Sequence, residues 1–332
     1  HESNYEMAEA VLLTALEIHE KTFGSNHNKV ASTSEDLAYL YSKMQLYEKS
    51  EKFYLRTLKI YKNNLGSQHY FVADTLYRFA HLYEKQFKYS KAEELFLESL
   101  AIKDKSVSQE NETYLHSIDA LAMFYRGQKK YDLAAPYVRR GLQIEFKLIQ
   151  KEVPYLLLSE RREFLTSLGS TYKRAFSSTQ QSQINASLAL FSRLNRQGLL
   201  EEIEKRQAQL SGLTGPQKDI AKELRVLSQQ LASISLSSEQ RQSLKITKEE
   251  LEKQLYRLLP ELEPRIVEVH QVANSIPSDG VLVEYQRFKA FDRNKPPYQR
   301  WGNARYLALV LKPNSEIETV DLGLAAPLEE KI

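Results

Sequence analysis

The residue types that most often carry catalysis or bind metals are sparse in this sequence of 332 residues. It contains seven histidines and no cysteine, so these residues form no disulfide, no cysteine-ligated metal site and no cysteine nucleophile. His27 and His69 could ligate a metal, but each follows a glycine by three positions and they occupy the same place in a repeated pattern. A structural role in a linker explains both better. The other histidines lack a ligand spacing, and no Gly-rich phosphate loop is present, so we expect no metal and no cofactor.

A second chemical signal is the alternation of basic and aromatic residues over 285–306. The basic residues are Arg287, Lys289, Arg293, Lys295, Arg300 and Arg305, and the aromatic ones are Tyr285, Phe288, Phe291, Tyr298 and Trp301. Such a mixture can bind single-stranded nucleic acid, because bases stack on aromatic rings while phosphates pair with cations. These aromatic residues flank predicted strands and a Pro-Pro loop, so ordinary packing beside a solvated loop is favoured and nucleic-acid binding is the weaker alternative.

Composition places the chain among globular proteins. Hydrophobic residues make up 42% and charged residues 27%, which is typical of that class, and the length suggests about two domains. The 46 basic and 43 acidic residues leave a net charge of +3, which favours no particular class of partner. No apolar run approaches the ~18 residues of a membrane helix and no signal peptide opens the sequence. A cytoplasmic location is therefore expected.

The strongest pattern is an internal repeat with a period of 42 residues. The segment 37–60 returns at 79–102 and at 121–144, and its second half also occurs at 5–18. The positions that keep the register are Tyr5, Tyr47, Tyr89 and Tyr131, then Leu16, Leu58, Leu100 and Leu142, then Ile18, Ile60, Ile102 and Ile144. A fixed period of this length predicts a solenoid of stacked units.

Each unit has the pattern of two helices. Leu37, Ala38 and Tyr41 share one stripe of the first helix, and a short polar turn separates them from the stripe of the second. The small residues Ala38 and Ser50 indicate where the two helices cross closely. Because one helical hairpin cannot bury its apolar face alone, the copies must stack on each other.

These spacings resemble the tetratricopeptide repeat, whose usual period is 34 residues. The resemblance covers roughly residues 5–147, and the eight extra residues per unit are similar to those of kinesin-light-chain repeats, in which a longer second helix ends in a Gly-x-x-His linker. That linker occurs at Gly24 and Gly66, whereas the third unit has Ser108 and Asn111 in its place. The first hairpin lacks its opening helix, so we expect the sequence to be a fragment.

Further helices are predicted after the repeats. A helix over 156–176 leaves the 42-residue register and suits a capping role, a polar break follows at 177–182, and a long helix covers 184–210. Two leucine seams within 224–262 then predict an antiparallel coiled hairpin, which we favour over a homodimer formed by this arm. A short helix is predicted over 265–274.

Near the end of the sequence the hydrophobic period changes to two. Strands are predicted over 281–288, 306–311 and 317–322, and a helix begins at about 327. From about residue 188 the order of elements is similar to the front half of the CHAT family, a caspase-like domain found after tetratricopeptide repeats. The strings that carry this resemblance are SRLNRQGLLEE (192–202), IPSDGVLVEY (276–285), RWG (300–302), RYLALVL (305–311), VDLG (320–323) and APL (326–328).

The CHAT resemblance implies a cysteine peptidase of the caspase type in the parent protein, with a His base and a Cys nucleophile beyond Ile332. It assigns no catalytic residue to this chain.

The resemblance to tetratricopeptide repeats also implies a binding groove, since the first helix of each hairpin lines the concave face of such arrays. Steps of 42 residues carry the inward positions onto Glu35, Tyr39, Ser42 and Lys43, then Tyr77, His81, Glu84 and Lys85, then Asp119, Met123, Arg126 and Gly127. A merely solvated face is the plain alternative. Tyr39, Tyr77, His81 and Met123 would supply the apolar bodies that a peptide groove needs.

We therefore expect a mainly α protein, with a TPR α-solenoid followed by a helical hairpin and a small β segment that begins an α/β caspase-like domain. The expected divisions are 1–150 for the repeats, 151–183 for the capping helix and linker, 184–275 for the helical arm and 276–332 for the truncated CHAT strands. The expected function is to bind a peptide or partner protein in the groove and so regulate the attached peptidase. A non-enzymatic scaffold or adaptor is the alternative, and no enzyme activity is expected of these residues themselves.

Overall fold

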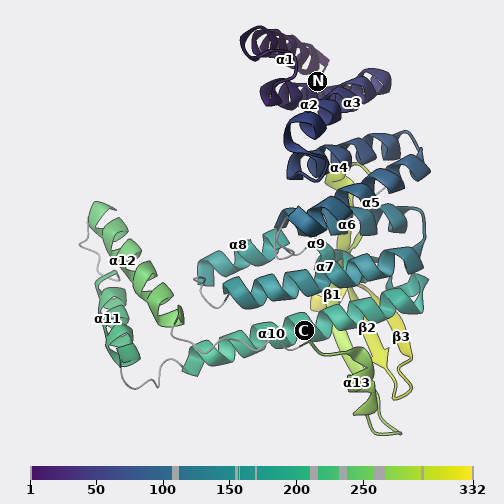
Figure 1. Cartoon of the computed structure of the whole chain (residues 1–332). Coiled ribbons are helices and arrows are strands. Elements are labelled where there is room, and N and C mark those ends of the chain that lie inside the picture. The colour runs from purple at the N-terminus through teal and green to yellow at the C-terminus, as the bar shows by residue number, and fades with distance from the viewer. Residues whose placement is uncertain are drawn as a thin grey trace. The chain divides into compact units, whose positions relative to one another are not determined.

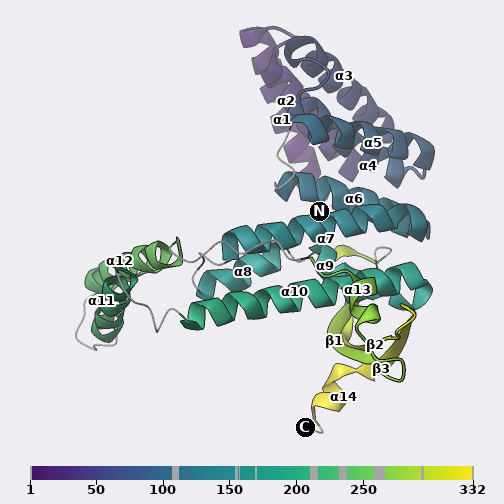
Figure 2. The ribbon, with the colours of Figure 1, turned by 60° about the horizontal axis from the view of Figure 1, so that its bottom comes forward.

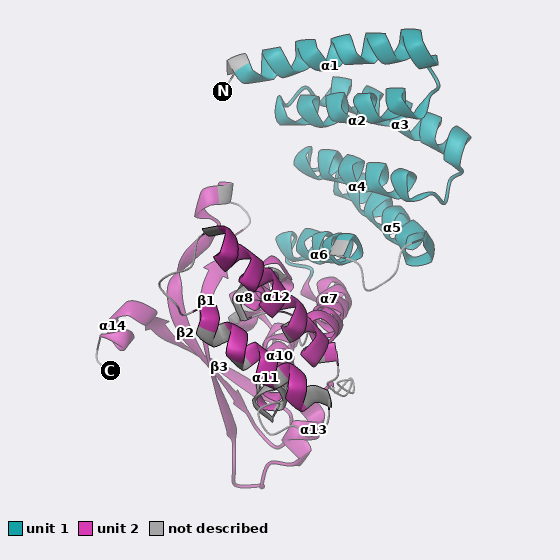
Figure 3. Ribbon diagram, turned by 90° about the vertical axis from the view of Figure 1, so that its left-hand side faces the viewer, with its two compact units in different colours: residues 1–130 teal, residues 131–332 magenta. Residues whose placement is uncertain are grey.

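The computed structural model describes residues 2–106, 112–153, 156, 158–168, 170–209, 216–231, 238–257, 266–292 and 295–330. The chain forms two compact units, His1–Lys130 and Tyr131–Ile332 (Figure 3). In these described ranges, no helix has both the length and the apolar character required to cross a bilayer.

The first unit is a succession of helices (Figure 1). Its helices are α1 (Glu2–Phe23), α2 (Asn28–Lys43), α3 (Tyr47–Leu65), α4 (Tyr70–Lys85), α5 (Tyr89–Ser106) and α6 (Glu112–Gly127). The starts of α2, α4 and α6 lie 42 residues apart, and so do those of α3 and α5. The period predicted from the sequence is therefore the period of the structure.

The Gly-x-x-His linkers join one hairpin to the next. Gly24 and Gly66 have φ angles of +85° and +87°, a left-handed conformation that glycine adopts without steric cost. Three residues later, His27 and His69 cap α2 and α4, and each Nδ1 accepts the backbone N–H two residues further on at 3.2 Å. This contact satisfies one of the free donors at a helix start. The linker role predicted for both histidines is confirmed.

The turn inside each hairpin repeats as well. Gln45, Phe87 and Lys129 have φ angles of 61°, 59° and 60°, although none of them is glycine. A left-handed non-glycine residue costs roughly 1–2 kcal/mol, so other contacts must hold the turn. The next backbone N–H donates to the carbonyl of the signature tyrosine in every case, from Leu46 to Tyr41 (2.9 Å), from Lys88 to Tyr83 (2.9 Å) and from Lys130 to Tyr125 (3.0 Å).

The core of the first unit consists of the predicted signature positions. Leu37, Ala38, Tyr41, Phe79, Ala80, Tyr83, Leu121, Ala122 and Tyr125 are all buried. At the predicted close crossing, the Ser50 hydroxyl donates to the Ala38 carbonyl at 2.6 Å. The small side chains at both positions allow this approach of the two backbones.

Each signature tyrosine also carries one repeated polar contact. The hydroxyl donates to a glutamate 32 residues earlier, from Tyr41 to Glu9 (2.7 Å), from Tyr83 to Glu51 (2.9 Å) and from Tyr125 to Glu93 (2.8 Å). Burial, followed by the glutamate partner, raises the pKa of Tyr41 and Tyr83 to about 12. The contact ties the first helix of each hairpin to the preceding second helix, so it fixes the stacking of successive units.

The second unit begins with a helical layer. Its elements are α7 (Tyr131–Glu152), α8 (Leu158–Leu168), α9 (Ser170–Ala175), the 3-10 helix η2 (Phe176–Gln181), α10 (Gln183–Gln209), α11 (Pro216–Leu231), α12 (Ser238–Arg257) and α13 (Val269–Asn274). Helices α11 and α12 pack against each other (Figures 1 and 2), with Leu227 and Leu255 buried. This pairing is the predicted intrachain hairpin. Leu258 and Leu262 of its second seam lie outside the described residues.

The single helix predicted over 156–176 is wrong, because α8 and α9 are separate. The Glu145 carboxylate accepts the backbone N–H groups of Thr171 and Tyr172, at 3.0 and 3.3 Å. A helix start leaves such donors without intrahelical partners, and Glu145 allows a new helix to begin there. The polar break expected over 177–182 is mostly the 3-10 helix η2, whose first residue Phe176 is buried.

A three-stranded antiparallel sheet follows, in the order β1-β2-β3. Its strands are β1 (Leu282–Phe291), β2 (Trp301–Leu311) and β3 (Ile317–Leu324), with the 3-10 helix η4 (Pro297–Gln299) before β2 and α14 (Ala325–Glu329) after β3. The three strands were predicted, although each is longer than expected. Central β2 buries Leu307, Leu309 and Leu311, whereas β1 alternates half-buried and exposed residues.

Helix α10 lies along one face of the sheet (Figure 2). The Gln183 side chain bonds to both the N–H and the carbonyl of Ile317, at 3.4 and 3.1 Å. Arg193 pairs with Glu284 of β1 at 3.1 Å. These contacts anchor the sheet to the helical layer within the second unit.

Candidate protein-binding surface

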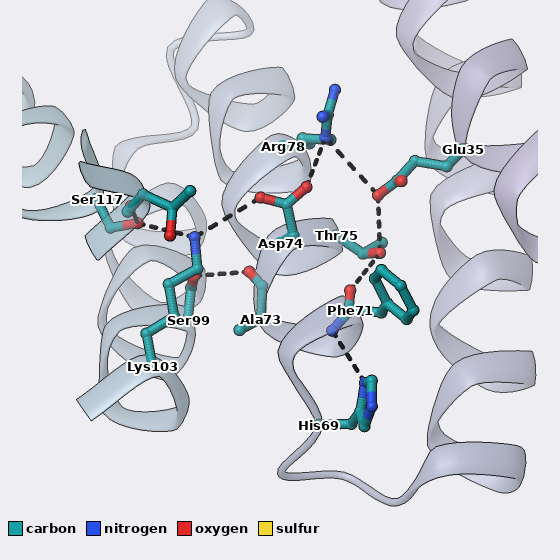
Figure 4. A network of polar contacts seen from close by, with 11 residues as sticks. Glu35, His69, Phe71, Ala73, Asp74, Thr75, Arg78, Ser99, Lys103 and Ser117 are labelled. Carbon is teal, nitrogen blue, oxygen red and sulfur yellow. Dashed lines mark hydrogen bonds and ion pairs between the residues drawn. The ribbon is translucent and has the colours of Figure 1, made fainter. Parts of the chain in front are cut away.

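The predicted groove positions lie on α2, α4 and α6, and we call their side chains the first-helix surface. A polar network joins α2 to α4 across this surface (Figure 4). The Thr75 hydroxyl donates to Glu35 at 2.8 Å, and Arg78 lies 3.0 Å from the Asp74 carboxylate and 3.9 Å from that of Glu35. Arg78 thus bridges carboxylates from two successive repeats.

Lys103 of α5 extends the network to the next repeat. Its ammonium donates to the Ser117 hydroxyl of α6 at 2.9 Å and lies 3.6 Å from Asp74 (Figure 4). The same group lies 5.5 and 5.1 Å from the ring centroids of Tyr70 and Tyr77. The network therefore holds α2, α4, α5 and α6 together through charged side chains.

Burial governs the electrostatics of this network. It raises the pKa of Glu35, against the opposing effects of Thr75 and Arg78, and it lowers the pKa of Lys103, against the opposing effect of Asp74. Glu35 and Asp74 balance Arg78 and Lys103 in formal charge. The network thus joins these helices through paired charges.

A basic and aromatic cluster lies at the carboxyl ends of α2 and α4. The Lys85 ammonium donates to the Ser42 hydroxyl at 3.0 Å, and the Lys43 ammonium lies 5.0 Å from the centroid of the Tyr39 ring. Burial, and then the charge of Lys43, lowers the pKa of Lys85. Tyr39 is 46% exposed, so the cluster presents an aromatic ring beside two cations.

The other predicted aromatic positions are more enclosed. Tyr77 and His81 are half-buried, and their rings meet edge to face at 4.8 Å. Phe96 packs against His81 at 4.9 Å, and the His81 Nδ1 lies 3.0 Å from the Glu84 carboxylate. These side chains pack against one another and are less exposed than Tyr39.

The amino-terminal third of the chain is similar to a known repeat family. The tetratricopeptide repeat model matches residues 1–63 and 29–105. Residues 1–105 are therefore tetratricopeptide repeats. No curated protein matches the chain.

Two kinds of solved structure are similar to this chain. A protein of Podosopora anserina described as a kinesin light chain with nearly identical TPR-like repeats has 20% identity and a TM-score of 0.39, over 63% of this chain and 89% of that one. BtubC (BKLC) of P. vanneervenii has 16% identity and a TM-score of 0.41, over 79% of this chain and 96% of that one.

The predicted groove residues differ in their exposure. Tyr39, Lys43, Lys85 and Gly127 are exposed, Glu35, Tyr77, His81, Glu84, Asp119, Met123 and Arg126 are half-buried, and Ser42 is buried. Hydrogen bonds bring Glu35 and Ser42 of α2 to α4, through Thr75 and Lys85 respectively. Sequence reasoning missed Asp74, Arg78 and Lys103. The spacing of four residues between Asp74 and Arg78 was the available signal, because such pairs meet on one helix face.

Proposed function

We propose that the first-helix surface binds an extended or helical segment of a partner protein. Tetratricopeptide repeats in general mediate protein–protein interactions, and residues 1–105 match that family. The observation that carries the proposal is the exposed Tyr39 ring beside Lys43, on helices held by the Glu35–Arg78 network. Tyrosine is among the residues in which binding energy concentrates at interfaces. A preorganised surface also loses little entropy when its ligand binds.

In this proposal the cluster of Tyr39, Lys43 and Lys85 makes the principal contacts. An aromatic ring beside two cations suits a segment with one apolar anchor next to an acidic or carbonyl oxygen, because such a pair can stack on the ring and accept from an ammonium. Tyr77, His81 and Met123, which are half-buried, would form the floor of the groove.

The proposal extends to the parent protein as a regulatory role. The resemblance of 276–328 to the CHAT family supports an attached caspase-like peptidase, which ligand binding to the repeats would regulate. This chain contains no cysteine, so a caspase-type nucleophile has to be supplied by other residues of the parent. The four divisions at 1–150, 151–183, 184–275 and 276–332 are part of this proposal. A non-enzymatic scaffold or adaptor is the alternative if the parent has no His–Cys pair.

The binding proposal is tested by selecting ligands from a displayed library of random peptides and measuring their affinity by fluorescence anisotropy. Tyr39→Ala should weaken binding at least ~10-fold, as expected for a central aromatic contact, and the double variant Tyr77→Ala, His81→Ala should weaken it further. Leu55→Ala is the matched control, because Leu55 is similarly exposed but lies on the second helix α3. Unchanged affinity in the Tyr39→Ala variant, or equal losses of affinity in Tyr39→Ala and Leu55→Ala, would show that the peptide binds elsewhere.

The regulatory part has its own test. The parent reading frame past Ile332 should encode a histidine and a cysteine, and replacing that cysteine should abolish proteolysis by the parent. A parent without the pair, or one whose proteolysis does not respond to the selected peptide, would leave the scaffold alternative.

A further inference from the structure

A cleft of about 620 Å³ opens in the second unit between α9 and strands β1 and β2. This volume is typical of sites that bind small ligands or short segments of chain. Aromatic residues in its lining include Tyr172, Phe288 and Trp301, and basic ones include Lys173, Arg174 and Lys289. Within the described part of the chain, no acidic residue contributes to the lining. The cleft is thus aromatic in its walls and positive in charge.

The cleft follows the edge of β1 that faces away from β2, and no other described strand pairs with β1 there. In an antiparallel ladder, successive residues direct their main-chain groups alternately toward the partner strand and away from it. The Arg287 carbonyl points away from β2, since it accepts a hydrogen bond from the Gln286 side-chain amide at 2.6 Å. By this alternation, the main-chain groups of Val283, Tyr285 and Lys289 also face the free edge.

The Gln286 side chain bonds to a main-chain group of β1 that a neighbouring strand could otherwise use. Its amide nitrogen donates to the Arg287 carbonyl, while its oxygen accepts from the Tyr172 hydroxyl at 3.1 Å. At the far end, the Phe291 N–H donates to the Ser177 hydroxyl of η2 at 3.0 Å, which closes the edge there. The open edge over 283–289 is roughly 23 Å long at about 3.3 Å per residue. It can accept a strand of about seven residues.

The charges beside this edge select among possible strands. Arg287 pairs with Glu329 at 2.8 Å, but Lys173 and Lys289 form no ion pair with any described residue. A second copy of β1 would bring Arg287 and Lys289 against like charges, and such charges on an edge strand oppose self-pairing. An acidic strand would instead gain cross-strand ion pairs.

We propose that an extended acidic peptide adds to the free edge of β1 as a fourth strand. Main-chain hydrogen bonds then supply the affinity and alternate side chains the specificity. Gln286 and Phe288 lie on the half-buried face of β1, and Arg287 and Lys289 on the exposed face. The ligand therefore alternates apolar residues, which enter the cleft, with acidic residues beside Arg287 and Lys289. This site does not depend on the first-helix surface.

The test uses the whole 332-residue chain and a terminally blocked heptapeptide of alternating valine and glutamate. Trp301 lines the cleft and is the sequence's only tryptophan, so its fluorescence reports binding directly. A saturable change is expected. The same peptide with lysine in place of glutamate should bind at least tenfold more weakly. An analogue methylated on alternate backbone nitrogens should lose at least tenfold as well, because it lacks the donors that pair with the edge.

Variants sharpen this test. Lys289→Glu should weaken binding of the glutamate peptide and strengthen binding of the lysine peptide. Gln286→Ala should tighten binding of the glutamate peptide, because the Arg287 carbonyl is then free for the ligand. Lys245→Glu is the matched control, since Lys245 is an exposed lysine on α12 away from the cleft, and it should change neither affinity.

Equal binding of the methylated analogue would overturn strand addition. A hexathymidylate strand that changes Trp301 fluorescence where the glutamate peptide does not would assign the cleft to nucleic acid instead. The absence of both a fluorescence change and calorimetric heat with the glutamate peptide would reject the site.

Discussion

Lys103 in the first unit and Glu145 in the second occupy the same position of the 42-residue repeat, and both are buried, with 2% and 0% exposure. They carry opposite charges. The Lys103 ammonium donates to the Ser117 hydroxyl at 2.9 Å, whereas the Glu145 carboxylate accepts the N–H groups of Thr171 and Tyr172 at 3.0 and 3.3 Å. A buried cation in the repeats thus corresponds to a buried anion after them.

The difference shows how this repeat position attaches the element that follows. His19 and Lys103 each bond to a hydroxyl 14 residues later, on the first helix of the next hairpin, where Thr33 and Ser117 lie. Glu145 instead bonds to backbone donors that begin at Thr171, 26 residues later. A short α9 stands there in place of another repeat helix, so the change of residue type at this position marks where the repeat register ends.

Charge reversal at Glu145 should have the largest effect. Glu145→Lys places a buried cation against two backbone donors and near Arg196, whose positive charge already acts on Glu145. An unpaired buried charge of this kind costs several kcal/mol, so we expect a loss of roughly 4 kcal/mol or more. Urea unfolding followed by the fluorescence of Trp301 reports the second unit alone. A loss below about 1 kcal/mol would mean that Glu145 does not attach α9.

The pH dependence of Glu145 should be the next largest effect. Burial raises the pKa of Glu145 to about 7, although Arg196 and the N–H donors oppose the shift. Because the folded state then binds the proton more tightly than the unfolded state, stability falls as the pH rises from about 4.5 to about 7. The expected loss is roughly 3 kcal/mol.

The variant Glu145→Gln removes this pH dependence of stability, because glutamine cannot ionise. The difference in unfolding free energy between wild type and Glu145→Gln, followed by Trp301 fluorescence, should change by that amount between pH 4.5 and 7.5 in favour of the variant. A constant difference would show that the backbone donors and Arg196 keep the carboxylate at its ordinary pKa.

The repeats could be predicted residue by residue because each contact occurs several times. The burial of Leu37, Phe79 and Leu121, the crossing at Ala38 and the linker role of His27 all follow from periodicity and side-chain size. A contact that recurs every 42 residues requires a similar residue at each repeat, so each copy of the pattern supports the interpretation of the others.

The network on the first-helix surface could not be predicted in the same way. Asp74, Arg78 and Lys103 correspond to Ser32, Asp36 and Tyr61 of the preceding repeat, so the network occurs once and leaves no period. In the second unit, Glu145 accepts backbone N–H groups at the start of α9. A backbone donor requires no particular residue type, so this contact leaves no pattern in the sequence. Contacts between residues far apart in the chain, such as Tyr172 with Gln286, are likewise single events.

A smaller loss of stability is expected from overpacking a helix crossing in the first unit. Ala80 is fully buried at the crossing of α4 and α5, so Ala80→Leu should overpack this crossing and cost about 1–3 kcal/mol. Ala101→Leu on α5 is the control, because Ala101 is exposed and leucine is tolerated well in a helix. Hydrogen exchange of the α4 and α5 amides measures both. Equal protection in the two variants would contradict the assigned register.

The smallest effect is expected for Lys103→Met. Its partners keep other contacts when the ammonium is removed, since Asp74 still pairs with Arg78 at 3.0 Å and the Ser117 hydroxyl still donates to the Thr113 carbonyl at 3.2 Å. Methionine fills a similar volume without a buried charge, and such replacements of buried ionic groups are often neutral or stabilising. The change in stability of the first unit should stay within about 1 kcal/mol.

Methionine at the equivalent position of the second unit, Glu145, should lower stability more. Glu145→Met leaves the Thr171 and Tyr172 donors without their acceptor, which costs about 1–3 kcal/mol per buried group. Hydrogen exchange should therefore show α4–α6 protected as in wild type for Lys103→Met and α9 deprotected for Glu145→Met. If Lys103→Met deprotects α6 as strongly as Glu145→Met deprotects α9, the two residues are equivalent attachments, and the position is essential throughout the repeats and not only at their end.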